Sequence, residues 1–277
     1  MDVKLLHSQP CVNLYGYAQH KIKYNPKEWK NLRLIIDTGS NISIIKKDKF
    51  QASSGKRTFT IKSLSRQLSI EYVEVILNLR HNKTKDMIEK KQFYSMELSD
   101  QFKFDGLIGN DVLSKFLVVF DLPEKIMFIK KNPNFQYGFL EYEKVDIIYG
   151  QGHIFLPLRL NNSKKQIFIF DTGSAISYIN PENLKNLGLV QNRKLKYVDI
   201  SGKMLESHTY KAKTVCTPSK KLCSKNLEFL SGNSLKNFIT IKEAKIDGLL
   251  GLNWIKDYVI AIDYDSKMMY IKKKGWF

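Results

Sequence analysis

The chain has 277 residues, 43% of them hydrophobic, and a formal net charge of +18. Its length suits two domains of roughly 135 residues with ordinary cores, and no apolar run approaches the ~20 residues that span a membrane as a helix, so we expect no membrane span. Lys outnumbers Arg by 39 to six and is scattered along the chain, whereas nucleic-acid recognition favours Arg, so we expect no nucleic-acid partner.

Short β-type segments separated by turn residues dominate both halves of the chain and predict an all-β protein. In the first half we expect strands at residues 12–15, 33–36, 116–120 and 126–129, and a hairpin with arms at 57–61 and 70–79. In the second half we expect strands at residues 154–160, 167–170, 195–198, 210–216, 227–230, 259–262 and 268–271.

The predicted helices are short. Asn180 suits the N-cap of a helix, Pro181 its first position and Gly188 its C-terminal stop. A further helical turn or two is expected over residues 111–116 and over residues 253–258. These segments add a few short helices to a fold made mainly of strands.

The tetrapeptide Asp-Thr-Gly-Ser occurs twice, at residues 37–40 and 171–174, and each copy lies between two apolar segments. The similarity of the two halves continues at residues 104–109 (FDGLIG) and 246–251 (IDGLLG). A repeat of this kind decides the architecture, and two copies favour a pseudo-two-fold pair of domains over a solenoid.

We place the domain boundary where the polar segment 130–138 predicts a linker. The N-terminal domain then covers residues 1–136 and the C-terminal domain residues 137–277. Two complete copies in one chain predict that a monomer is sufficient for any site built from both.

Each repeated turn brings a carboxylate to the end of a buried strand. Gly39 and Gly173 permit a sharp turn and a close approach of the opposite copy. If Asp37 and Asp171 meet at ~3 Å, they cannot both ionise easily and will share a proton. One carboxylate can then act as general base on a water and the other as general acid. This chemistry needs no metal, no cofactor and no covalent nucleophile.

Hydroxyl groups flank both aspartates. We expect Thr38 and Thr172 to lock the two turns together by hydrogen bonds from hydroxyl to backbone. We expect Ser40 and Ser174 to donate to the neighbouring carboxylates, which favours the ionised form and lowers the pKa. This last expectation predicts activity that peaks on the acidic side of neutral.

The histidines and cysteines give weaker signals. The five histidines are widely separated and show no metal-ligand spacing. Cys216 and Cys223 flank a predicted turn, where a disulfide and two reduced thiols are both compatible with the sequence. Cys11 has no evident partner in the sequence.

The duplicated Asp37 and Asp171 motifs, with the later hydrophobic-hydrophobic-Gly segments that end at Gly109 and Gly251, resemble the aspartic protease family of pepsins and retropepsins. The resemblance covers nearly the whole chain, in the single-chain form. It implies two pseudo-two-fold-related β-barrel lobes of the acid-protease fold, with Gly109 and Gly251 threaded behind the active turns. It also implies an endopeptidase that cleaves peptides or proteins in the interlobe cleft and binds pepstatin-like inhibitors.

The chain departs from pepsins in several ways. Its first aspartate is already at residue 37, so we expect no inhibitory segment in the sequence as given, and both motifs end in Ser. The closer likeness is to compact bacterial or retropepsin-like enzymes with a fused duplicate. The N-terminus has no apolar segment long enough for a signal peptide, and the compartment stays open because an export signal could have been removed.

The family also implies a hairpin flap over the cleft. By position, the flap candidates are Ser63, Leu64 and Ser65 in the first half and Ser201 and Gly202 in the second. Tyr72 lies past the first tip, so we do not assign it the role of the flap tyrosine. The alternative function is a peptide- or protein-binding module on the same fold that does not hydrolyse its ligand.

Overall fold

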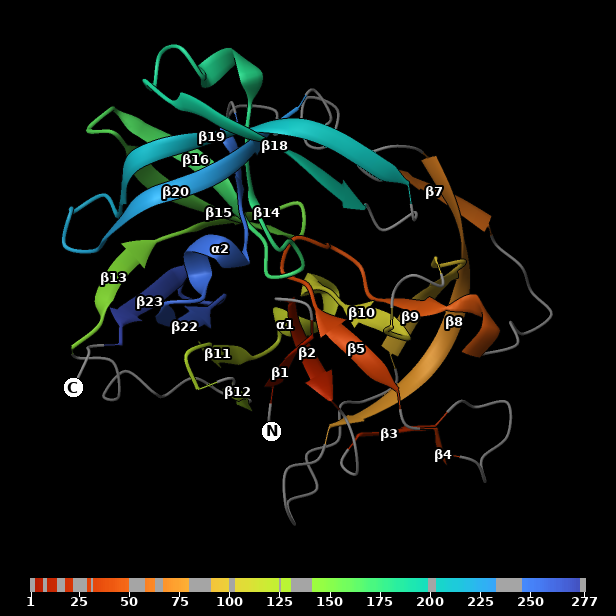
Figure 1. Ribbon diagram of the computed structural model, residues 1–277. Coiled ribbons are helices and arrows are strands. Elements are labelled where there is room, and N and C mark those ends of the chain that lie inside the picture. The colour runs from red at the N-terminus through yellow and green to blue at the C-terminus, as the bar shows by residue number, and fades with distance from the viewer. Residues whose placement is uncertain are drawn as a thin grey trace.

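The computed structural model describes residues 3–6, 9–13, 18–21, 29–30, 32–49, 58–62, 67–79, 91–99, 103–124, 126–130, 141–198, 203–232 and 246–274. Strands dominate this part of the chain, as predicted, and form three sheets (Figure 1). The helices are single turns: α1 (Asn110–Leu113), α2 (Leu252–Ile255), η1 (Lys47–Lys49) and η3 (Pro181–Asn183). No helix among the described residues is long and apolar enough to cross a membrane.

The first sheet belongs to the first half of the chain. Its order is β1-β2-β5-β10-β6-β9-β8-β3-β4, with β7 paired to β8, and the described pairings form an open path from β1 to β4. Its strands are β1 (Val3–Leu6), β2 (Gln9–Asn13), β3 (Ala18–Lys21), β4 (Trp29–Lys30), β5 (Arg33–Ile36), β6 (Ile44–Lys46), β7 (Thr58–Lys62), β8 (Gln67–Leu79), β9 (Lys91–Met96) and β10 (Gly106–Ile108).

The third sheet belongs to the second half and has the order β14-β15-β16-β21-β17-β20-β19-β18. Its strands are β14 (Ile148–Gly150), β15 (His153–Leu160), β16 (Lys165–Phe170), β17 (Ser177–Ile179), β18 (Val190–Val198), β19 (Met204–Cys216), β20 (Cys223–Ser231) and β21 (Gly248–Leu250). In Figure 1 it lies at the upper left and the first sheet lies on the right.

The middle sheet takes strands from both halves, in the order β12-β11-β22-β23-β13. It is joined across the halves by β11 and β22, which pair antiparallel with Val118 opposite Ile262. Its strands are β11 (Leu117–Asp121), β12 (Ile126–Lys130), β13 (Glu143–Asp146), β22 (Tyr258–Asp263) and β23 (Met268–Lys273). The predicted domain boundary between residues 136 and 137 lies outside the described residues.

The repeated sequences form equivalent local structures. In the first half β10 runs parallel to β5 and antiparallel to β6. In the second half β21 runs parallel to β16 and antiparallel to β17. Each Asp-Thr-Gly-Ser turn follows a strand, β5 or β16, that has a paired strand on both sides. Both strands are continuous apolar runs, which suits strands that are buried on both faces.

One large apolar core joins the three sheets. It contains Ile36 of β5, Phe120 of β11, Phe170 of β16 and Ile260 of β22, each fully buried. Burial of side chains from all three sheets in one cluster is the main term that holds the halves together. It also fixes the ends of β5 and β16. The two Asp-Thr-Gly-Ser turns, at residues 37–40 and 171–174, begin there, and we call them the first and second active turns.

Several predicted elements differ from the observed ones in length or type. The segment capped by Asn180 is a 3₁₀ turn rather than an α-helix, although the side chain of Asn180 accepts from the Glu182 N–H at 3.1 Å as predicted. The strand predicted at 195–198 begins earlier, at Val190, and pairs with β19 as one arm of a hairpin. The flap candidates lie outside the described residues: Ser63, Leu64, Ser65, Ser201 and Gly202.

The open question of the two cysteines is answered by the register of β19 and β20. Cys216 lies directly opposite Cys223 in this hairpin, and the two form a disulfide. Antiparallel neighbours in register have Cβ atoms close enough for such a bridge.

Candidate active site

The structure brings the two predicted aspartates together. Asp37 follows β5, and its N–H donates to the carbonyl of Ile108 at 2.9 Å. Asp171 follows β16, and its N–H donates to the carbonyl of Leu250, also at 2.9 Å. The neighbouring strand thus holds each aspartate backbone in the same way, and the two carboxyl groups are hydrogen-bonded to each other.

The glycines that follow the aspartates make this approach possible. The N–H of Gly39 donates to Asp37 Oδ1 at 2.9 Å, and the N–H of Gly173 donates to Asp171 Oδ1 at 2.8 Å. A Cβ on Gly39 would lie 2.2 Å from Asp171 Cγ, and one on Gly173 would lie 2.5 Å from Asp37 Cγ. Each carboxyl group therefore occupies the space that a side chain of the opposite turn would need.

Thr38 and Thr172 lock the turns together, as the sequence predicts. The Thr38 hydroxyl donates to the Phe170 carbonyl at 2.9 Å, and the Thr172 hydroxyl donates to the Ile36 carbonyl at 2.6 Å. Each hydroxyl oxygen also accepts the backbone N–H of the other threonine, at 3.0 and 3.1 Å. Both threonines are fully buried, so these four bonds connect the two halves without competition from water.

The pKa values of both aspartates are shifted in a way that favours a shared proton. Burial raises the pKa of Asp37 above its ordinary value, against the lowering effect of the hydrogen bonds that its carboxylate accepts. Burial, followed by the charge of Asp37 and the hydrogen bond with it, raises the pKa of Asp171 well above its ordinary value. The two carboxyl groups therefore share one proton, and they titrate as a pair.

The prediction for the two serines is wrong. The Ser40 hydroxyl donates to the Ile42 carbonyl at 2.7 Å, and the Ser174 hydroxyl donates to the Ile176 carbonyl at 2.8 Å. A serine hydroxyl in a tight turn readily bonds to backbone two residues away, and this local bond replaces the expected one to the carboxylate. The bond from Ser174 to Asp171 comes instead from its backbone N–H, at 3.1 Å.

Gly109 and Gly251 pass directly behind the active turns, as the family resemblance implies. A Cβ on Gly109 would lie 2.4 Å from the Ile42 carbonyl oxygen, and one on Gly251 would lie 2.7 Å from the Ile176 carbonyl oxygen. The next residue on each side donates its N–H to the serine of the turn, from Asn110 to Ser40 and from Leu252 to Ser174. The two glycines are thus structural. The segments that contain them stabilise the last residue of each turn, Ser40 or Ser174, by these hydrogen bonds.

Sequence reasoning missed Asn110, which lies fully buried at the first active turn. Its Nδ2 donates to the Thr38 carbonyl at 2.6 Å and to the Gly152 carbonyl at 2.8 Å. Its Oδ1 accepts from the hydroxyl of Tyr264 at 2.8 Å. The only sequence signal is a polar residue directly after the Gly-Leu-Ile-Gly segment, where the second half has Leu252.

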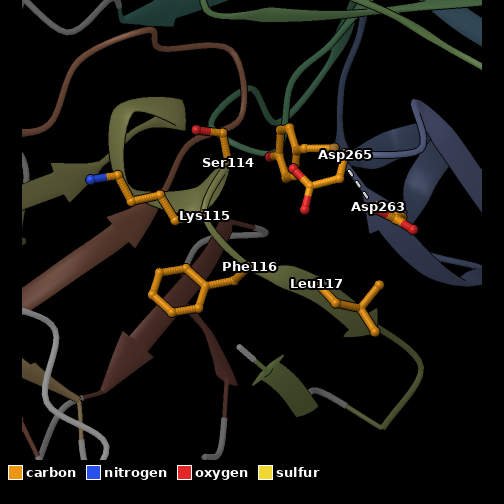
Figure 2. Close-up of a pocket in the computed structure, with 7 residues that line it drawn as sticks. Ser114, Lys115, Phe116, Leu117, Asp263 and Asp265 are labelled. Atoms are coloured by element: carbon orange, nitrogen blue, oxygen red, sulfur yellow. Dashed lines mark hydrogen bonds between the residues drawn. The ribbon is translucent and has the colours of Figure 1, made fainter. Parts of the chain in front are cut away.

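Figure 2 shows a cavity of about 240 Å³. It is lined by Ser114–Leu117, after α1, and by Asp263–Asp265, in the turn between β22 and β23. Neither Asp37 nor Asp171 is among the residues that line it. Within the described ranges, no group of three or more His, Cys, Asp or Glu side chains is placed to hold a metal ion.

Comparison of the chain with protein-family models and with curated proteins gave no match. Inferences about function therefore rest on the geometry of the two turns and on the chemistry of their residues.

Proposed function

We propose that the protein is an aspartic endopeptidase, which hydrolyses peptide bonds with a water activated between Asp37 and Asp171. The observation that carries the proposal is the hydrogen-bonded pair of buried carboxyl groups on two equivalent turns, both with raised pKa values. Two carboxyl groups that share one proton are suited to the roles of acid and base.

The shared proton lets one carboxyl group act as base and the other as acid, and we describe the state in which Asp171 holds the proton. Asp37, ionised, accepts a proton from the water as its oxygen attacks the peptide carbonyl carbon. Asp171 gives its proton to the carbonyl oxygen, so a neutral tetrahedral diol forms and the negative charge moves to Asp171. Transfer of the proton on Asp37 to the amide nitrogen and return of a diol proton to Asp171 then break the C–N bond. One water is consumed, and one carboxyl group and one amine are released.

The proposal extends to the architecture. We infer two lobes of the acid-protease type, one centred on the β5–β6–β10 unit and one on the β16–β17–β21 unit, which share the middle sheet. The hairpins β7–β8 and β18–β19 occupy corresponding places in the two halves, since β8 continues to β9 and β19 to β20 in the same antiparallel manner. An extended peptide between the lobes is the substrate class that this arrangement accommodates.

Peptide cleavage by wild type and dyad variants tests the proposal. The protein is incubated with a diverse peptide mixture between pH 4 and 7.5, with and without pepstatin, beside Asp37→Asn and Asp171→Asn. Asp146→Asn, on the exposed face of β13, is the matched control. We expect cleavage by wild type and control, inhibition by pepstatin and no cleavage by either dyad variant.

Equal silence of wild type and dyad variants would overturn the proposal. Retention of peptides by the wild type without any cleavage would favour a binding module on the same fold instead.

A further inference from the structure

The first active turn is supported from the second half of the chain by the hairpin of β14 and β15. Gly150 and His153 pair across a two-residue turn in which Gln151 and Gly152 both have positive φ, at 53° and 77°. A Cβ on Gly152 would lie 2.5 Å from Asn41 Cβ, so only glycine fits against the chain that follows the active turn. The carbonyl of Gly152 also accepts from Asn110.

His153 is the residue of this hairpin that reaches the active turn itself. Its ring is hydrogen-bonded to the backbone of Gly39. The N–H of Gly39 already donates to Asp37 Oδ1, so the acceptor is the Gly39 carbonyl. His153 is 7% exposed, and its buried Nδ1 has no hydrogen-bond partner.

The corresponding position in the first half of the chain holds a different type of residue. His153 is two residues before Phe155, whose partner Ile169 is two residues before Asp171. In the first half Ile35 is two residues before Asp37, and its partner is Cys11. The residue two positions before Cys11, which corresponds to His153, is Gln9. His153, a type of residue that can titrate near neutral pH, therefore corresponds to Gln9, which does not titrate.

We infer that His153 is a positioning residue for the first active turn and that it fulfils this role with a neutral ring. This inference rests on the proposed function, because the turn that it positions carries Asp37. A second ring proton on Nδ1 would be a buried donor without an acceptor, and a charged ring would lose its hydration.

The surroundings agree with a neutral ring. Burial lowers the pKa of His153 below its ordinary value, against the opposing effect of the hydrogen bond to Gly39. The titratable groups on the neighbouring elements include the carboxyls of Asp37 and Asp171 and the hydroxyls of Tyr149, on β14, and Tyr264, which contacts Tyr149 edge to face. A charged ring beside the first turn would favour ionised Asp37 and so disturb the sharing of the proton.

Two substitutions separate the effect of the hydrogen bond to Gly39 from the effect of protonation of the His153 ring. His153→Gln keeps a side-chain donor but does not titrate, whereas His153→Phe removes the donor and keeps an aromatic ring. His208→Gln, which replaces a histidine on β19 that bonds to Gln191, is the control. We expect His153→Phe to lower kcat ~10-fold or more at pH 7 with little change in KM, and His153→Gln to restore most of it.

The pH profile is the readout that a merely structural role would not change. The ratio of kcat for His153→Gln to kcat for wild type should rise only at a pH clearly below 6.5, because the lowered pKa keeps the wild-type ring neutral down to that range. The difference in Tm between wild type and His153→Gln should already move against the wild type as the pH falls below 6.5, because the unfolded chain then binds a proton that the folded ring does not.

The outcomes distinguish this inference from the proposed function. A ratio and a Tm difference that stay constant from pH 4 to 7 would overturn the role of His153, even in an active protease. A wild type that cleaves no peptide, with the Tm difference still dependent on pH, would overturn the proposed function and leave the support of the turn in place.

Discussion

Gly39 in the first active turn faces the carboxyl group of Asp171 in the second so closely that a Cβ would lie 2.2 Å from Asp171 Cγ. Cβ atoms in proteins essentially never come within 3.0 Å of another heavy atom in this way. Gly173 has the reciprocal relationship with Asp37, at 2.5 Å. The absence of two side chains thus sets the separation of the carboxyl pair.

Replacement of Gly39 by Ala should therefore separate the dyad. The added methyl group must displace Asp171, and misplacement of a catalytic group by about 1 Å can cost ~100-fold in rate. We expect Gly39→Ala to lose ~100-fold or more in peptide hydrolysis. Gly150→Ala is the control, because a Cβ there meets no atom within 4 Å. A Gly39→Ala protein with more than half of the wild-type activity would show that the glycine does not set the dyad.

The hydrogen bonds that Thr38 and Thr172 form across the two turns should contribute to the stability of the folded protein. Thr172→Val keeps the shape of the side chain but leaves the Ile36 carbonyl and the Thr38 N–H without their hydroxyl partner. Each buried polar group left unpaired costs about 1–3 kcal/mol, so we expect the free energy of unfolding to fall by roughly 2–6 kcal/mol. Urea denaturation measures this change, with Thr214→Val on β19 as control. Equal stability of Thr172→Val and wild type would refute the assigned role.

The raised pKa of Asp171 has a consequence for stability that is independent of catalysis. A carboxyl group whose pKa is higher in the folded state favours folding at low pH, and this contribution is lost as the pH rises through the folded pKa. Asp171→Asn removes the titration, while its amide oxygen can still accept from Gly173 and Ser174. We expect the variant to be more stable than wild type at pH 7, with an advantage that shrinks towards pH 4.

Thermal unfolding between pH 3 and 8 measures this difference. Asp146→Asn, an exposed residue, should show no comparable dependence on pH. A Tm difference between Asp171→Asn and wild type that does not vary with pH would contradict the raised pKa.

The bond between Asn110 and Tyr264 should be measurable as a coupling energy. Asn110→Leu introduces the residue of the second half and leaves the Tyr264 hydroxyl unpaired, whereas Tyr264→Phe leaves Asn110 Oδ1 unpaired. The two residues share a buried network, so the effects of the single changes on unfolding should not add in the double variant. We expect a coupling of about 1–3 kcal/mol from chemical denaturation. Strict additivity would show that the two side chains act independently.

The parts of the site that sequence could predict are those that the repeat contains twice. Asp37 and Asp171, the glycines that follow them and the interlocked threonines all come from the duplicated tetrapeptide, and the structure places them as expected. Duplication is informative because two equal turns can form the same contacts in both directions. The boundaries of strands were less predictable, since pairing with neighbours extended β18 and β20 beyond their apolar residues.

The parts that sequence could not predict break the repeat or depend on a choice between partners. Asn110 and His153 have Leu252 and Gln9 at the corresponding positions, so comparison of the halves gave no signal for them. The hydroxyls of Ser40 and Ser174 can reach either a carboxylate or a backbone carbonyl, and only the path of the turn decides between them. The disulfide likewise depended on the register of a hairpin.

The most direct test of joint catalysis by the two aspartates is a comparison of single and double dyad variants on one cleaved peptide. The value of kcat/KM is measured for wild type, Asp37→Asn, Asp171→Asn and the protein with both substitutions. In the proposed mechanism the two carboxyls share one proton and act on one water, so each single variant should lose about as much activity as the double variant. If either single variant keeps a substantial fraction of wild-type kcat/KM, the two aspartates do not form one catalytic unit.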